Sequence, residues 1–104
     1  MTQPEKLEHI LNGASAYFGI PREDWTKKSG SRSNTWRKKR YLIPLLYDYT
    51  DSTWFDIMRL LGYNQHGTIK FHYDNLKEEI SGEFYSSPKT KMVYKELLEY
   101  LKLQ

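Results

Sequence analysis

Four polar side chains recur at intervals of three or four residues near the middle of the chain: Gln65, Thr68, His72 and Asn75. On a helix this spacing places all four on one face. Amide, hydroxyl and imidazole groups can donate and accept hydrogen bonds, as the edges of nucleic-acid bases do. Because the face carries almost no charge, it suits contacts to base edges better than simple solvation.

This polar face belongs to a pair of helices that we expect over about residues 52–81, joined by a tight turn at Gly62. Asp51 or Ser52 is the expected cap of the first helix, and Asn64 offers a cap for the second. The residues expected to face inward are Trp54, Ile57, Met58, Leu61, Ile69, Tyr73, Leu76 and Ile80. The sequence therefore predicts one oily and one polar face on the second helix.

The most basic part of the chain lies just upstream, in a loop expected over about residues 27–40. From Arg22 to Arg40 the net charge is +6, which leaves −3 for the rest of a chain whose total is +3. Such a segment is a plausible electrostatic footprint for a polyanion. The alternative is a solvated or disordered arm, which is the commoner outcome for runs of charge.

The remaining residues also follow helical periods. We expect a helix over about 7–18 ended by Gly19, a short helix opened by Pro21 that turns Trp25 inward, and a third helix capped by Asn34 or Thr35. Pro44 predicts a kink or local unwinding of that third helix. A last helix is expected to bury Val93, Leu97 and Leu101. The predicted fold is therefore a single all-α domain over residues 1–104, a compact bundle of about six helices.

Several classes of function have no support in the composition. The chain has no cysteine, which excludes disulfides and thiolate metal sites and fits a cytoplasmic location. His9, His66 and His72 have no carboxylate set at ligand spacing, so no metal site is expected. No apolar run is long enough to span a membrane, and no secretory signal opens the chain. Without a catalytic constellation or a phosphate-binding loop, we expect neither an enzyme nor a cofactor or small-molecule site.

From about Ala14 to Leu101 the chain resembles the C-terminal DNA-binding domain of the bacterial replication initiator DnaA, a Trp-repressor-like helix-turn-helix domain. The family's signature, Gly-Gly-Arg-Asp-His-Thr-Thr-Val, is here Gly-Tyr-Asn-Gln-His-Gly-Thr-Ile over residues 62–69. Gly62, His66 and Thr68 match it, and Ile69 replaces a valine. The resemblance implies binding to duplex DNA through the second helix of the pair, in replication initiation or transcription regulation. The departures within the signature imply a different target sequence.

On this basis two groups of contacts are expected. The residues expected to contact base edges in the major groove are Gln65, His66, Thr68 and His72. The residues expected to contact phosphates or the minor groove are Arg32, Arg37, Lys38, Lys39, Arg40, Asn64 and Gly67. Arg32 is the candidate for the minor groove by resemblance to the family's loop arginine. Trp25, Trp36 and Trp54 are expected in the core rather than as base-stacking platforms, with Trp36 left open.

A protein-interaction module is the alternative hypothesis. Its basic face would bind an acidic partner, and the aromatic residues of the last helix, Tyr94 and Tyr100, could supply a second surface. A bundle of this length, however, needs its last helix to close its own core. The interaction hypothesis also leaves the match over residues 62–69 unexplained.

Overall fold

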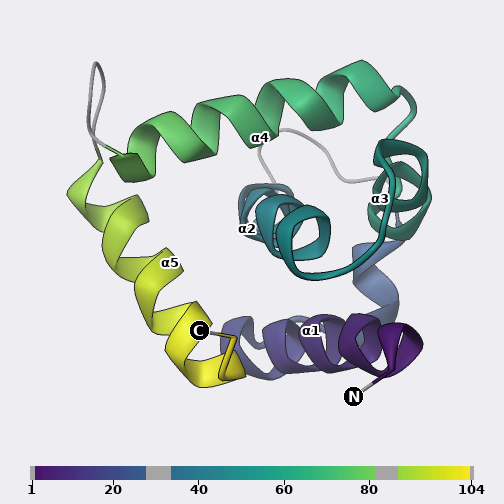
Figure 1. Cartoon of the computed structure of the whole chain (residues 1–104), viewed down its shortest axis with the longest axis horizontal. Coiled ribbons are helices and arrows are strands. Elements are labelled where there is room, and N and C mark those ends of the chain that lie inside the picture. The colour runs from purple at the N-terminus through teal and green to yellow at the C-terminus, as the bar shows by residue number, and fades with distance from the viewer. Residues whose placement is uncertain (1, 28–33, 82–86, 104) are drawn as a thin grey trace.

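The computed structural model describes residues 2–27, 34–81 and 87–103, and within these ranges it contains only helices (Figure 1). Their bounds are α1 Gln3–Phe18, η1 Arg22–Trp25, α2 Asn34–Tyr49, α3 Trp54–Leu61, α4 His66–Ser81 and α5 Pro88–Leu101. The prediction of an all-α protein is confirmed. The short helix opened by Pro21 is a 3-10 helix, so five of the six expected helices are α-helices.

Helix α2 is the centre of the fold. It runs nearly along the line of sight in Figure 1, with α4 above it, α1 below it, and α3 and α5 on its two sides. Its residues 42–46 are all buried, including Pro44. Helix α2 continues through Pro44 as one α-helix to Tyr49, so the predicted local unwinding does not occur, and a kink at Pro44 stays a prediction. Packing on every side of this segment therefore outweighs the loss of one helical hydrogen bond.

The ends of α1 and α3 carry explicit capping interactions. Gly19 closes α1 with a left-handed φ of 69°, as predicted. Helix α3 is capped by Thr53 rather than by Asp51 or Ser52, since Thr53 and Asp56 form a reciprocal capping box. Ser52 instead bonds the hydroxyl of Thr50. The cap therefore lies one or two residues later than expected.

The 3-10 helix connects α1 to the basic segment. Pro21 occupies its cap position, and Glu23 and Asp24 lie in its first turn. Trp25 is fully buried and donates its indole N–H to the hydroxyl of Ser15 at 2.6 Å. The inward orientation predicted for Trp25 is confirmed, and it fixes where the chain enters residues 26–27.

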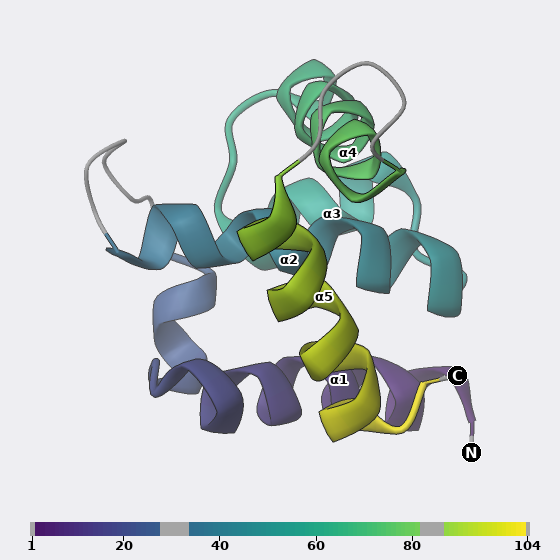
Figure 2. The same cartoon turned by 90° about the vertical axis from the view of Figure 1, so that its left-hand side faces the viewer.

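Helix α5 closes the core, as Figure 2 shows from the side. Tyr94, Leu97 and Leu101 are buried, whereas Val93, which was expected to be buried as well, is half-buried. At the C-terminal end of α5, the backbone carbonyl oxygen of Leu101 accepts a hydrogen bond from Nε2 of His9 on α1 at 2.7 Å. These residues of α5 hold the bundle together rather than forming a free surface.

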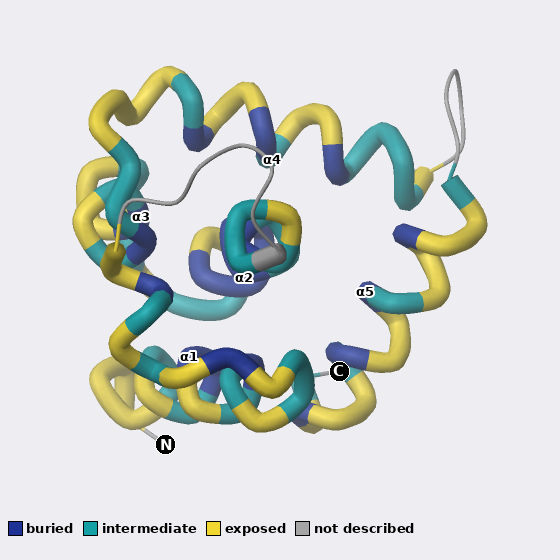
Figure 3. Tube along the Cα trace, turned by 180° about the vertical axis from the view of Figure 1, so that it is seen from behind, coloured by how far each residue is buried: buried dark blue, intermediate teal, exposed yellow. Residues whose placement is uncertain are grey.

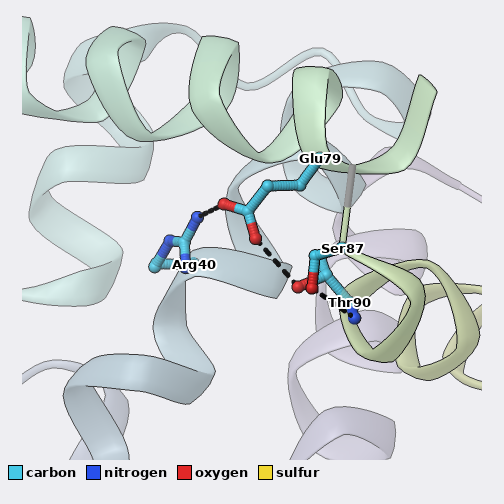
Figure 4. A network of polar contacts seen from close by, with 4 residues as sticks. All are labelled: Arg40, Glu79, Ser87 and Thr90. Atoms are coloured by element: carbon cyan, nitrogen blue, oxygen red, sulfur yellow. Dashed lines mark hydrogen bonds and ion pairs between the residues drawn. The ribbon is translucent and has the colours of Figure 1, made fainter. Parts of the chain in front are cut away.

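A polar network joins α5 to α4 and α2 (Figure 4). Glu79 of α4 forms an ion pair with Arg40 of α2 and accepts a hydrogen bond from the Thr90 hydroxyl at 2.9 Å. The Thr90 amide donates to the hydroxyl of Ser87, the cap residue of α5. Glu79 therefore anchors three helices at one point.

None of the helices described is long and apolar enough to cross a membrane.

Candidate nucleic-acid interface

The connection between α3 and α4 requires a glycine. Gly62 has a left-handed φ of 71° and caps α3. A Cβ at this position would overlap the carbonyl oxygen of Thr26 and would lie 2.9 Å from that of Lys27. The connection therefore packs directly on the residues that lead into the basic segment. Two stretches far apart in the sequence are held together by this contact.

The N-terminal end of α4 is open to solvent. Helix α4 begins at His66, so Gln65 rather than Asn64 directly precedes the first helical residue. Asn64, Gln65, His66 and Gly67 are all exposed, and a Cβ at Gly67 would have no atom within 4 Å. Free backbone N–H groups in the first turn of a helix favour an anion such as phosphate. This end of α4 can therefore meet a large ligand without rearrangement.

The imidazole of His66 has a fixed neighbour. It lies against the ring of Phe55 on α3, with the ring centroids 4.7 Å apart and the planes tilted by 32°. Phe55 remains 52% exposed. The contact restricts the orientation of a side chain that could donate to or accept from a base.

His72 does not lie on the exposed face, so its predicted base contact is wrong. Its side chain is buried and packs between α4 and α2, edge-on to Trp36 with ring centroids 5.7 Å apart. Burial, with a smaller contribution from the charge of Arg40, lowers the pKa of His72. Thr68 is half-buried. Of the four predicted base contacts, Gln65 and His66 are accessible, Thr68 is partly so, and His72 is not.

Lys39 is also buried, which contradicts its predicted role as a phosphate contact. It is only 1% exposed, and Nζ donates to the carbonyl oxygen of Lys27 at 2.5 Å. Burial lowers the pKa of this lysine. Its ammonium also lies 5.7 Å from the ring centroid of Tyr63, in the α3–α4 connection. Lys39 therefore joins three segments and has no access to a ligand.

Arg40 is already paired with Glu79, and its side chain is 24% exposed. That leaves two of the predicted phosphate contacts on the surface of α2. Arg37 is exposed, and Lys38 is half-buried over the ring of Phe18, 5.1 Å from its centroid. Arg32 lies outside the residues that the structure describes. The part of the basic segment that lies on α2 thus offers two cations to a ligand rather than the four predicted.

Acidic residues are absent from the first halves of both helices. No Asp or Glu occurs between Asn34 and Tyr47 or between Ile57 and Tyr73. The first acid on α4, Asp74, forms an ion pair with Lys70 at 2.9 Å. A polyanion approaching the starts of α2 and α4 would therefore meet cations and neutral polar groups.

Two accessible residues of this surface were not predicted from the sequence, Lys70 and Phe71. They lie on the outer side of α4, and Phe71 is 63% exposed. The sequence pattern contains this signal, because Phe71 lies about 160–200° around the helix from the buried Ile69 and the half-buried Tyr73. A large apolar residue in that position is unusual enough to mark the face.

No group of three or more His, Asp or Glu side chains that could hold a metal ion occurs in the described ranges. No protein-family model, curated protein or solved structure gives a significant match to this chain.

Proposed function

We propose that this protein is a sequence-specific duplex-DNA-binding module of the helix-turn-helix type, with a fold like that of the DnaA C-terminal domain. Helix α4 would enter the major groove by its N-terminal end. The single observation that carries the proposal is the exposed, acid-free start of α4, which is anchored through Gly62 to the beginning of the basic segment. A role in replication initiation or transcription regulation is part of the proposal.

The two kinds of contact have different chemical tasks. Gln65 and His66 would hydrogen-bond to base edges, with Thr68 at the rim of the contact. Arg37, Lys38 and the backbone at Gly67 would contact phosphates, and Arg32 remains the candidate for the minor groove. Phosphate contacts set affinity and orientation, whereas base contacts set sequence preference.

Binding is tested first with labelled random duplexes at low salt, by fluorescence anisotropy over a series of salt concentrations. We expect binding that weakens steeply as salt increases, because each neutralised phosphate releases a counterion. The double substitution Arg37→Ala/Lys38→Ala should weaken binding to every duplex and flatten the salt dependence by about two contacts. Absence of binding at micromolar protein would refute the proposal.

A matched control removes the same charge elsewhere. Lys91 and Lys95 are exposed on α5, away from the start of α4. The substitution Lys91→Ala/Lys95→Ala should change binding and its salt dependence much less than the α2 pair does. Equal effects from both pairs would mean that attraction is diffuse and that α4 is not at the interface.

Sequence preference is tested by selecting bound duplexes from a random pool. Gln65→Ala should lose about 1–3 kcal/mol of discrimination at one base pair of the selected site while retaining binding to random DNA. If Gln65→Ala and Arg37→Ala/Lys38→Ala changed affinity in the same way, the assignment of α4 as the reading helix would be wrong.

A further inference from the structure

The outer face of α4 carries an exposed phenyl side chain, that of Phe71, which takes no part in the proposed hydrogen bonds to bases. Phe71 is 63% exposed, more than any other large hydrophobic side chain described, and it stands one turn after Gly67. Single exposed hydrophobic residues are common and need no special explanation. The surroundings of Phe71 are what distinguish it.

Phe71 forms one wall of a hollow of about 350 Å³ between α4 and α2. Trp36 lines the hollow from α2, His72 lines it from α4, and Asn75 lies beside them one turn beyond Phe71. Figure 3, viewed from behind, shows exposed segments of α4 alternating with the buried ones that face α2. Phe71 is therefore part of an aromatic feature next to the start of α2, and this feature is continuous with the proposed DNA surface.

The charges around Phe71 favour an approach of DNA from the start of α4. Arg37 follows Trp36 on α2, and no acid precedes Phe71 on α4. The other end of the hollow is lined by Glu78 and Glu79, about two turns after Phe71, and Glu79 is paired with Arg40. A phosphate backbone can therefore approach the ring from the side of Gly67, because the glutamates at the far end would repel it.

The floor of the major groove has one apolar group, the 5-methyl of thymine, and phenylalanine is among the side chains that contact it. We infer that Phe71 contacts thymine methyl groups, so that thymine is specified at one or two positions of the bound sequence. This inference rests on the proposed function. Each methyl buried against the ring should contribute about fourfold to affinity.

The test uses the site selected from a random pool. Each thymine of that site is replaced in turn by uracil, which keeps every hydrogen-bonding group and removes only the methyl. Wild-type protein should bind about fourfold more weakly when one or two particular thymines are replaced. Phe71→Ala should bind the thymine duplex more weakly and show no further loss on those uracil duplexes.

Two controls keep the test specific. Met92 on α5 is 56% exposed, so Met92→Ala removes a comparable exposed hydrophobic residue and should retain the full uracil effect. Thermal unfolding followed by circular dichroism should give Phe71→Ala a midpoint within a few degrees of wild type, because an exposed side chain contributes little packing.

A failure of the inference about Phe71 can be distinguished from a failure of the proposed DNA binding. If wild-type protein binds no duplex, the proposed function itself is refuted. If it binds a selected site but tolerates uracil at every position, or selects a site without thymine, the inference about Phe71 is overturned while DNA binding stands. The inference is also overturned if Phe71→Ala remains as sensitive to uracil as wild type.

Discussion

The ammonium group of Lys39 lies 2.5 Å from the backbone carbonyl oxygen of Lys27, in the interior of the protein rather than on its basic surface. The hydrogen bond joins α2 to the residues that follow η1. Gly62 packs on the carbonyl groups of Thr26 and Lys27 as well. The start of the basic segment is therefore in contact with both α2 and the α3–α4 connection. Lys39 is therefore buried in the fold, whereas the neighbouring Lys38 is a half-buried side chain at the surface.

This difference predicts distinct effects for Lys38→Met and Lys39→Met. Methionine keeps most of the apolar stem of either lysine and removes the charge. Lys38→Met should weaken DNA binding and reduce its salt dependence by about one contact. Lys39→Met should leave the salt dependence unchanged, because that charge faces a carbonyl rather than solvent.

Unfolding in urea gives the complementary measurement for Lys39. Lys39→Ala should destabilise the fold by about 2–4 kcal/mol, because it opens a cavity and leaves the Lys27 carbonyl without this donor. Lys38→Ala should cost under about 1 kcal/mol, since that side chain is only half-buried. A reduced salt dependence for Lys39→Met would show that Lys39 reaches phosphate after all.

Gly62 and Gly19 form a matched pair for measuring the packing of the α3–α4 connection. Both have a left-handed φ, 71° and 69°, but a Cβ at Gly19 would have no atom within 4 Å. Gly19→Ala should therefore cost only the conformational term, about 1 kcal/mol. Gly62→Ala should cost about 3 kcal/mol or more, because it adds an overlap with backbone atoms. Equal losses of unfolding free energy would mean that the connection does not rest on Thr26 and Lys27.

Substitution of Gly67 by alanine should change the stability of the fold and the affinity for DNA in opposite directions. The open space around it allows a methyl group, and alanine is the better helix former. Gly67→Ala should therefore raise the free energy of unfolding by about 0.5–1 kcal/mol. If the DNA backbone approaches this position, the same substitution should weaken binding several-fold. A variant that is both more stable and equally tight in binding would remove Gly67 from the interface.

His72 should make stability depend on pH below neutrality. Its pKa is lowered from 6.5 in the folded protein by burial and by Arg40, so the unfolded chain takes up the proton more readily. Stability should be fully present above pH 6.5 and should fall as the pH decreases towards the folded pKa, by at most about 1.4 kcal/mol per pH unit.

The charged groups near His72 determine the pH range in which its titration can be measured separately. Arg40 faces it from α2, and Glu78 and Glu79 line the same hollow from α4. Urea unfolding between about pH 5 and 7.5 stays above the ordinary range of carboxylates. His72→Phe should flatten the dependence over this range, whereas substitution of the exposed His66 by Gln should leave it in place. A dependence that persists in His72→Phe would assign the titration to another group.

The helices were predictable because local signals were strong. Gly19 ends α1, and Ile69 and Leu76 mark the buried stripe of α4, as periodicity requires. The cap of α3 was misplaced because Ser52 and Thr53 are chemically equivalent candidates. Only the extended backbone of Thr53 and its pairing with Asp56 distinguish them.

The candidate site was less predictable because burial depends on the partner helix. His72 lies within about 60° of Ile69 and Leu76 around α4, so either edge of the stripe could have faced α2. The sequence does contain a signal for Lys39, which precedes Leu42, Ile43 and Leu46 by three, four and seven residues. That helical spacing places it on the core face of α2, despite the charges beside it.

The hydrogen bond between His9 and Leu101 has a practical consequence for attaching other molecules. It brings the last turn of α5 onto α1, and both ends of the described chain lie on the side of the bundle opposite α4 (Figures 1 and 2). A fluorophore, a flexible linker or a second copy joined at either end of the described chain would extend away from the α4 surface. Two copies tethered in tandem could then engage neighbouring sites on one duplex, and their combined affinity would be set by linker length.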